Sequence, residues 1–289
     1  DQVSAARNSW LASAAARDAA RLSIASAAAS GYIALLGLDA RRVVVLETIA
    51  ARAEALRLAR SRADAGYTSQ LELRQAEAEY QGAALILPQV DLAIARQENA
   101  LRLLTGDAPG VVPRGVALAA LIPPPLPDVG VPSQLLRRRP DIAQAEWTLA
   151  ASDASLSAAR KQFLPSVNLS ASAGAVFSSG LPDPITLWSV GGSILAPLFE
   201  GGRLRANVEG AAARRDQAAF AYRKAALTAF REVEDALAAV ASLSRQRATA
   251  EAQREAIAQA LRHAINRYQA GYSGYLEQLD AQRALLSAD

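Results

Sequence analysis

The sequence predicts a mainly α-helical protein, built of long antiparallel helical hairpins together with one β-hairpin. Alanine, the best helix former, makes up 68 of the 289 residues and aromatic residues only 5%, which suits long, closely packed helices. Long stretches also place apolar residues three and four positions apart. Finally, residues 61–76 match residues 266–281 at a constant offset of 205, with seven of sixteen positions identical. The chain is therefore predicted to contain two copies of one design.

The first copy occupies residues 1–105 and is predicted to be a helical hairpin. Residues 2–62 contain no proline, and one helix of that length spans roughly 90 Å. After the break "DAGYTS" a second helix is predicted from Gln70 to about Leu104, kinked at Pro88. A short break between two long helices produces an antiparallel pair. Residues 106–132 are rich in proline and glycine and are predicted to link the two copies.

The second copy begins with a helix in residues 133–164. Pro140 and Asp141 suit the first turn of a helix, because proline lacks an N–H that would be unpaired there and aspartate favours the positive end of the dipole. That helix is expected to end near Phe163. Residues 199–289 are predicted to form the second helical hairpin, with helix from Arg203 to Ile265 and a restart after the second Gly-Tyr break.

Residues 165–198 have a different periodicity. The segment 166–177 alternates polar and apolar side chains, which is typical of a strand with one wet and one apolar face. A return strand is predicted at 185–196, and Pro165 and Pro197 bound the pair. Because an isolated two-stranded hairpin is marginal in water, we expect it to join other hairpins.

Composition argues against several classes of function. The net charge is only +3 and acidic residues are interspersed with the arginines, which disfavours a nucleic-acid partner. There is no cysteine, and the single histidine, His263, has no second ligand nearby in the sequence. No catalytic triad, phosphate-binding loop or metal-ligand spacing occurs. We therefore expect no enzyme activity, no cofactor and no metal.

Four ordered motifs carry a resemblance to a known family. They are "LLRRRPDIAQAEWTLAASDASLSAARKQFLPSVNLSASAG", "WSVGGSILAPLFEGGRLRANV", "AFREVEDALAAV" and "RYQAGYSGYLEQLDAQRALL". They resemble the TolC-like outer-membrane efflux proteins, and most closely the lipoprotein branch that serves resistance-nodulation-division multidrug pumps. The resemblance covers nearly the whole chain. It implies a homotrimer with a transmembrane β-barrel in outer-membrane lipid and an α-barrel tunnel through the periplasm.

The resemblance also implies two partners and a complete set of strands. The partners are a periplasmic adaptor, or membrane fusion protein, and an inner-membrane pump. The family uses two β-hairpins per chain, whereas one is present here. The offset aligns Asp1 with Ala206, so we expect a further hairpin, its leading helix, and the signal and lipidation site to lie outside this numbering. Trp188 and Phe177 are candidate anchors at the membrane interface.

The two Gly-Tyr breaks correspond in the resembling family to periplasmic tips, where the tunnel narrows. Glu72 matches a tip carboxylate, and Arg267 and Tyr268 match its basic and phenolic partners. Leu276 and Asp280 match the constriction, and they share a helix face because they lie four residues apart. Glu277 falls where some members place another acid. The resemblance thus implies a gate at these residues.

An ordinary turn is the competing interpretation of the same segments. Glycine supplies positive φ, tyrosine forms a hydrophobic clasp, and an acid near the following helix N-terminus suits its dipole. For Gly66, Tyr67, Gly271 and Tyr272 we favour this interpretation, since turn geometry alone requires such residues. For Asp280 and the set of Glu72, Arg267 and Tyr268 we favour the gate, because Asp280 lies more than a turn past the break.

Two functions follow as hypotheses. The first is a passive export duct for drugs or other small solutes, serving as the outer-membrane component of a tripartite efflux pump. The alternative is a non-channel α-helical coiled-coil scaffold or adaptor. The segment 165–198 discriminates between them, because a soluble rod has no need of an alternating hairpin with Trp188 flanked by turn residues.

Overall fold

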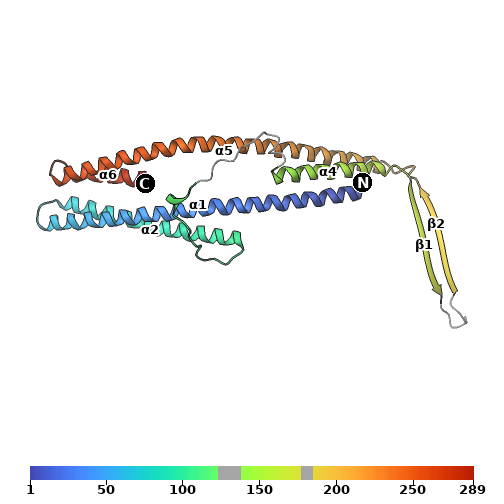
Figure 1. The fold of residues 1–289 in the computed structure, drawn as a ribbon, viewed down its shortest axis with the longest axis horizontal. Helices are drawn as coiled ribbons and strands as arrows, with labels where there is room; N and C mark the ends of the chain where they lie inside the picture. The colour runs from blue at the N-terminus through green and yellow to red at the C-terminus, as the bar shows by residue number, and fades with distance from the viewer. Residues whose placement is uncertain (123–137, 177–184) are drawn as a thin grey trace. The chain divides into compact units, whose positions relative to one another are not determined.

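The structure, a computed structural model, describes residues 1–122, 138–176 and 185–289. It is mainly helical with one β-hairpin, which confirms the predicted fold class (Figure 1). The elements are α1 (Gln2–Asp64), α2 (Gln70–Thr105), the short 3-10 helix η1 (Leu118–Ala120), α4 (Pro140–Lys161), β1 (Ser166–Val176), β2 (Ile185–Leu195), α5 (Arg203–Gln269) and α6 (Tyr275–Ala288).

The helix ends follow local chemistry. Ser69 caps α2 by accepting a hydrogen bond from the Glu72 backbone N–H at 3.3 Å, an interaction that satisfies one unpaired donor of the first turn. Pro140 opens α4 as predicted, with Asp141 in the first turn. The predicted ends differ by a few residues: α4 stops at Lys161 and α5 continues to Gln269. The turns that follow Lys161 and Gln269 set these two ends. Pro165, after α4, and Ile265, the last residue of the predicted helix, do not.

The two breaks of the repeat fold into the same turn. Gly66 and Gly271 have φ values of 76° and 79°, in the left-handed region that glycine adopts without strain. In each turn the following tyrosine N–H donates to an arginine carbonyl: Tyr67 to Arg62 at 2.8 Å and Tyr272 to Arg267 at 2.9 Å. This is the Schellman arrangement that ends helices. The sequence repeat is thus a structural repeat.

The described residues pack into two units. One comprises Asp1–Ala20 and Val129–Val233, the other Arg21–Asp128 and Glu234–Asp289, so α1 and α5 each continue from one unit into the other. These packing units do not follow the repeat boundaries. The division of the chain by repeat into 1–105, 106–132, 133–164, 165–198 and 199–289 stays a prediction.

In the first unit α4 packs on α5 through small side chains. Leu156 and Ala159 of α4 form a buried cluster with Ala211 of α5. Arg215 of α5 donates to Asp153 of α4 at 3.0 Å. The small alanines allow the two helices to approach closely, as the composition indicated.

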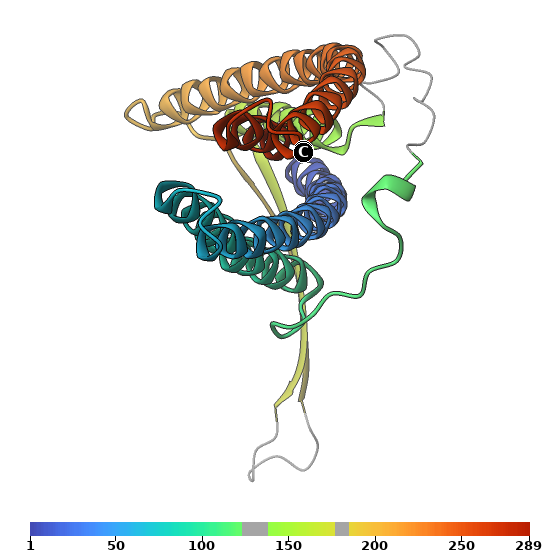
Figure 2. The same ribbon diagram turned by 90° about the vertical axis from the view of Figure 1, so that its left-hand side faces the viewer.

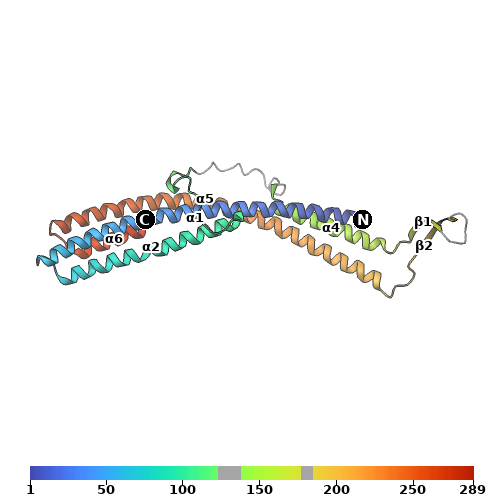
Figure 3. The same cartoon turned by 90° about the horizontal axis from the view of Figure 1, so that it is seen from below.

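In the second unit α1 and α2 run antiparallel, side by side (Figure 3). Arg42 and Asp91 form an ion pair of 2.7 Å across them. Further along, Gln97 donates to the Gly31 carbonyl at 2.9 Å, and a Cβ on Gly31 would lie 2.9 Å from the Gln97 amide nitrogen. A larger residue at position 31 would require the side chains of Gln97 and Leu101 on α2 to shift.

The strands β1 and β2 pair antiparallel over their whole length, from Ser166 opposite Leu195 to Val176 opposite Ile185. This confirms the predicted hairpin. The register puts Val167, Leu169, Ala171 and Ala173 on one face with Ile194, Val190 and Trp188. The other face carries Asn168, Ser170 and Ser172, and Ser172 bonds Ser189 at 2.9 Å. All residues of both strands are exposed.

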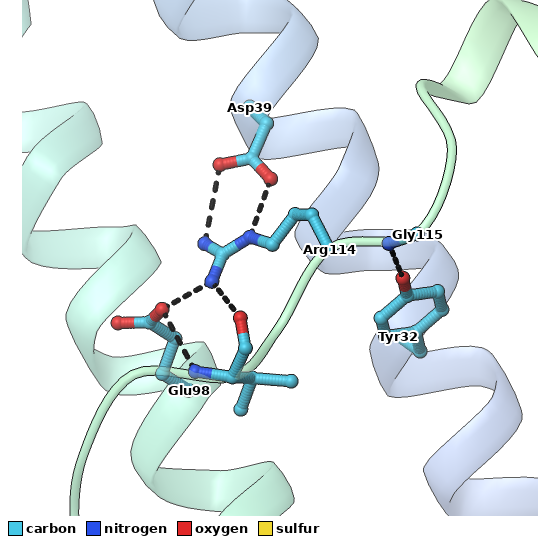
Figure 4. Close-up of polar contacts among 6 residues, drawn as sticks. Tyr32, Asp39, Glu98, Arg114 and Gly115 are labelled. Carbon is cyan, nitrogen blue, oxygen red and sulfur yellow. Dashed lines mark hydrogen bonds and ion pairs between the residues drawn. The ribbon is translucent and has the colours of Figure 1, made fainter.

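Arg114 binds the segment after α2 to the α1–α2 pair (Figure 4). Its guanidinium donates to Asp39 of α1 at 2.9 Å and also bonds Glu98 of α2. The neighbouring Gly115 N–H donates to the Tyr32 hydroxyl of α1 at 2.9 Å. The described part of the predicted linker therefore ties two helices together as well as connecting the copies.

Candidate functional site

The two helical turns lie at the same end of the second unit in Figure 1, and Figure 2 views the molecule from that end. This is expected for two copies of one design. A small apolar cluster joins the helices behind the turns. It comprises Ala59 of α1, Leu73 and Ala76 of α2, and Tyr275 and Leu279 of α6, with Tyr268 of α5 packed against it. Because residues of four helices share this cluster, the first hairpin tip and the second are held in contact.

Glu72 and Tyr268 connect the two tips directly. The Tyr268 hydroxyl donates to Glu72 Oε1, and Thr68 Oγ1 donates to Glu72 Oε2. The Arg62 guanidinium stands 5.2 Å from the Tyr268 ring centroid, within the range of a cation–π contact. Sequence reasoning paired Glu72 with Tyr268, and the structure brings them together.

Burial raises the pKa of Tyr268 to about 12, and the hydrogen bond to Glu72 adds to that rise. Both causes favour the neutral phenol: burial disfavours the phenolate, and the phenol must keep its proton to donate to a carboxylate. The tip contact is therefore made by a neutral phenol that donates to the Glu72 carboxyl group.

Arg267 does not take the place expected for it. Its guanidinium pairs with Glu277 of α6 at 3.1 Å, and both side chains are largely exposed. One residue along a helix is a rotation of about 100°, so Arg267 faces its own hairpin while Tyr268 faces the other. The cation near Glu72 and Tyr268 is instead Arg62, which the repeat aligns with Arg267. The expected Arg267–Glu72 pairing is thus corrected to Arg267–Glu277 within this chain.

Helix α6 has a buried face and an exposed face. Tyr275, Gln278 and Leu279 are buried. Leu276 is 57% exposed, and the exposed Asp280 carboxylate lies 3.8 Å from Arg283. Leu276 and Asp280 thus share the face that points away from the buried cluster, as their spacing predicted.

The predicted turn tyrosines and the predicted membrane-interface residues have few contacts where the structure describes them. Tyr67 and Tyr272 at the turns are 85% and 81% exposed, so they do not clasp the turns by packing. Trp188 lies on the apolar face of the β-hairpin, opposite Ala173, and is exposed. Phe177 lies outside the described residues.

A polar cluster that sequence reasoning missed lies further from the turns. It consists of Arg52 of α1, Glu79 of α2, and Gln282 and Arg283 of α6. The available signal was spacing: Glu79 follows Glu72 by seven residues and Gln282 follows Tyr275 by seven, which places each pair on one helix face. In the described parts of the chain, no group of three or more His, Cys, Asp or Glu residues could hold a metal ion.

Long paired helical hairpins joined at their tips, together with an exposed amphipathic β-hairpin, define the class of outer-membrane channel proteins with a periplasmic helical part. The chain belongs to the outer membrane efflux protein family, whose sequence pattern matches residues 1–107 and 131–289. This membership places it in the outer membrane and periplasm.

Individual relatives agree with this family. Outer membrane protein OprJ of Pseudomonas aeruginosa is 36% identical over 297 residues, covering 97% of this chain and 59% of OprJ. The solvent efflux pump outer membrane protein SrpC of Pseudomonas putida is 37% identical over 252 residues, covering 83% of this chain and 52% of SrpC. The chain therefore spans between half and three fifths of the length of these relatives.

Solved structures share the fold. A crystallised membrane protein from Pseudomonas aeruginosa has a TM-score of 0.92 at 34% identity, covering 99% of this chain and 68% of that one. The outer-membrane channel OprN has a TM-score of 0.90 at 30% identity, covering 99% of this chain and 65% of OprN. These named relatives are efflux and channel proteins, not enzymes.

Proposed function

We propose that this chain forms part of a homotrimeric outer-membrane channel that serves as the passive exit duct of a tripartite efflux pump. The support comes from the family and from relatives whose names describe an efflux pump outer membrane protein and an outer-membrane channel. Drugs or other small solutes would pass outward, with energy supplied by an inner-membrane pump through a periplasmic adaptor.

The β-hairpin carries the proposal. Every residue of β1 and β2 is exposed, yet one face is apolar from Val167 to Ala175 and includes Trp188. An exposed apolar face of this kind is unfavourable in water, whereas outward apolar and inward polar alternation is the pattern of a membrane barrel. A soluble scaffold does not account for these residues.

The long helix α1 does not need a membrane role of its own. One 18-residue window in it reaches a mean hydropathy of 1.4, enough to span a bilayer by length and composition only. Alanine-rich helices that pack side by side have the same composition, and α1 packs along α2. We therefore assign α1 to the periplasmic tunnel.

The helical tips form the gate in this proposal. Glu72 and Tyr268 hold the inner hairpin, α5–α6, against the outer hairpin, α1–α2, while Arg267 and Glu277 stabilise the inner hairpin itself. Around a three-fold axis the exposed Leu276 and Asp280 would form an apolar ring and an acidic ring. Gly66 and Gly271 shape the turns, and the exposed Tyr67 and Tyr272 offer surface to the adaptor or pump.

The proposal is tested with the full-length protein, purified in detergent and reconstituted in planar lipid bilayers. We expect the mass of a trimer and stepwise, cation-favouring conductance. A monomeric helical rod that is stable without detergent and does not conduct would contradict the channel and support the scaffold.

A further inference from the structure

The cluster of Arg52, Glu79, Gln282 and Arg283, called here the inner cluster, is a polar network in the described part of the second unit that the tip contact does not include. Arg52 is only 3% exposed, an unusual position for a permanent charge. A buried guanidinium is tolerated where hydrogen bonds and an opposite charge compensate it. The partners of Arg52 therefore show what the cluster connects.

Those partners come from two other helices. Arg52 Nη1 donates to Gln282 Oε1 of α6, and Arg52 Nη2 lies 3.6 Å from Glu79 Oε2 of α2. Glu79 Oε1 in turn accepts from Arg283 Nε of α6 at 3.1 Å. Glu79 is thus shared by two arginines, one on its own hairpin and one on the neighbouring hairpin.

The inner cluster lies at a second level along the same interface. Glu79 and Gln282 each lie seven residues beyond a residue of the tip, so the inner cluster is displaced by about 10 Å along the helices. At the tip, Tyr268 of α5 bonds α2. At the inner level, α6 bonds both α1 and α2. The two levels therefore fix different helices of the inner hairpin.

We propose that the inner cluster is a second latch, which holds α6 on the α1–α2 pair and releases it when the tunnel opens. This inference rests on the proposed channel function and adds two positioning residues on α6, Gln282 and Arg283, to the gate. Neither was among the gate residues expected from the sequence.

The contacts of the inner cluster are arranged so that α6 can leave the α1–α2 pair without leaving a buried charge unpaired. If α6 moves away, Arg52 and Glu79 remain together on the α1–α2 pair, so neither charge is left alone. Arg283 is already half exposed and needs only water. A groove of about 330 Å³, lined by Arg52, Glu79 and Arg283 among others, adjoins the cluster and is large enough to admit water. A cluster that served only to stabilise the fold would not need to divide in this way.

The test uses distances between the two tips. The chain contains no cysteine, so Tyr67→Cys and Tyr272→Cys introduce the only two thiols for spin labels, both at exposed positions. Pulsed electron resonance on labelled chains, diluted with excess unlabelled chains, reports the distance within one chain. Arg283→Ala and Gln282→Ala are compared with the parent, and Arg283→Lys with Arg283→Ala.

We expect Arg283→Ala to raise the population of longer distances about two- to fivefold, the factor set by losing an exposed ion pair. Arg283→Lys should restore most of the parent distribution, because it restores the charge. Arg57→Ala is the matched control, since Arg57 pairs only with Glu54 of the same helix among the contacts described. Unchanged distances in both α6 variants, with Tyr268→Phe shifting them, would overturn the second latch.

The two proposals fail separately. The distance measurement does not depend on conduction, so a shift in Arg283→Ala supports the latch even where the bilayer shows no channel. Conversely, a conducting parent whose Arg283→Ala and Gln282→Ala variants keep both its conductance and its distances leaves the channel standing and removes the latch.

Discussion

Two neighbouring tyrosines at the hairpin tips have opposite hydrogen-bonding states. The rings of Tyr268 and Tyr275 are 5.7 Å apart at an angle of 59°. The Tyr268 hydroxyl donates to Glu72, whereas the buried Tyr275 hydroxyl has no hydrogen-bond partner among the described residues. A satisfied hydroxyl stabilises the contact between the hairpins, and an unsatisfied buried hydroxyl opposes it.

The same substitution is therefore expected to have opposite effects at these two positions. Tyr268→Phe should weaken the contact by about 1.5–3 kcal/mol, because it removes a bond to a charged acceptor. Tyr275→Phe should leave the contact unchanged or stabilise it by up to about 1–3 kcal/mol, since it removes a buried unsatisfied group. Urea unfolding, with the tip distance as a second signal, measures both. Equal destabilisation by the two variants would contradict the assignment.

The pH dependence of the tip contact follows from Tyr268. Its pKa rises from 10.0 to about 12 when the tips are docked, mainly through burial. The docked state binds the proton more tightly, so this contribution is fully present below about pH 10 and is lost as the pH rises through 12. We expect tip distances to be constant from pH 6 to 9 and to lengthen above pH 10. Tyr268→Phe, compared by ultraviolet tyrosinate titration, should lack one phenol that ionises above the ordinary range.

The sequence predicted part of this site and missed part of it. Glu72 and Tyr268 lie 196 residues apart, so no local pattern pairs them, and the resemblance to a family supplied the pairing. The same resemblance assigned Arg267 to Glu72, but the rotation of one residue on α5 turns Arg267 to Glu277. The inner cluster was missed because the sequence of a helix with many charges does not show which of its arginines is buried.

At the scale of the element, the repeated turns depend on backbone conformation. Gly66 and Gly271 have positive φ, and open space surrounds both positions, so a methyl group would meet no neighbour. Any penalty for alanine there must come from the backbone alone. Gly82, inside α2, also has open space around it, but its φ is not positive, and it provides a matched control.

We expect Gly66→Ala and Gly271→Ala each to lower stability by about 1 kcal/mol or more, because alanine is strained at positive φ. Gly82→Ala should raise stability by about 0.5–1 kcal/mol, since alanine is the better helix residue. Denaturant midpoints of the three variants at constant m-value provide the comparison. If the two turn variants behave like Gly82→Ala, the conformations assigned to the turns are wrong.

The elements also show what periodicity can and cannot provide. Alanine content and the three- and four-residue spacing were enough to predict the helices, and the period of two was enough to predict β1 and β2. The attachment of the segment after α2 was not predictable in this way. It depends on Arg114 reaching Asp39 and Glu98, which are 75 and 16 residues away. The hydrogen bonds to Asp39 and Glu98 hold the pKa of Arg114 above its ordinary value, although burial acts in the opposite direction.

At the scale of the whole molecule, the β-hairpin and the tips must act in a trimer if the proposed function holds. The observed register assigns Leu169 and Ser170 to opposite faces. We expect a spin label at position 169 to be accessible to oxygen in lipid, and a label at 170 to be accessible to a water-soluble nickel reagent. The measurement uses trimers in lipid vesicles. Equal accessibility at both positions, or a period near 3.6 along 167–175, would contradict a barrel strand.

The final prediction concerns the gate. It distinguishes the residues that close the channel from the residue that selects ions. Glu72→Ala combined with Tyr268→Phe removes the part-buried contact between the tips, which contributes about 1.5–3 kcal/mol in each chain. Three copies in a trimer add to several kcal/mol, enough to change the open population of a two-state gate substantially. The resting conductance in planar bilayers should therefore rise.

Asp280→Ala should act differently, because Asp280 is exposed and pairs only weakly with Arg283 at 3.8 Å. Its removal takes away a ring of three carboxylates that would attract cations and repel anions, so reversal potentials in a salt gradient should shift toward zero while resting conductance stays closer to that of the parent. Arg57→Ala, which removes an exposed charge on α1 that pairs with Glu54 of the same helix, should change neither quantity. If the combined tip variant and Asp280→Ala both conduct and select as the parent does, the Gly-Tyr segments are ordinary helical turns, and the channel closes elsewhere.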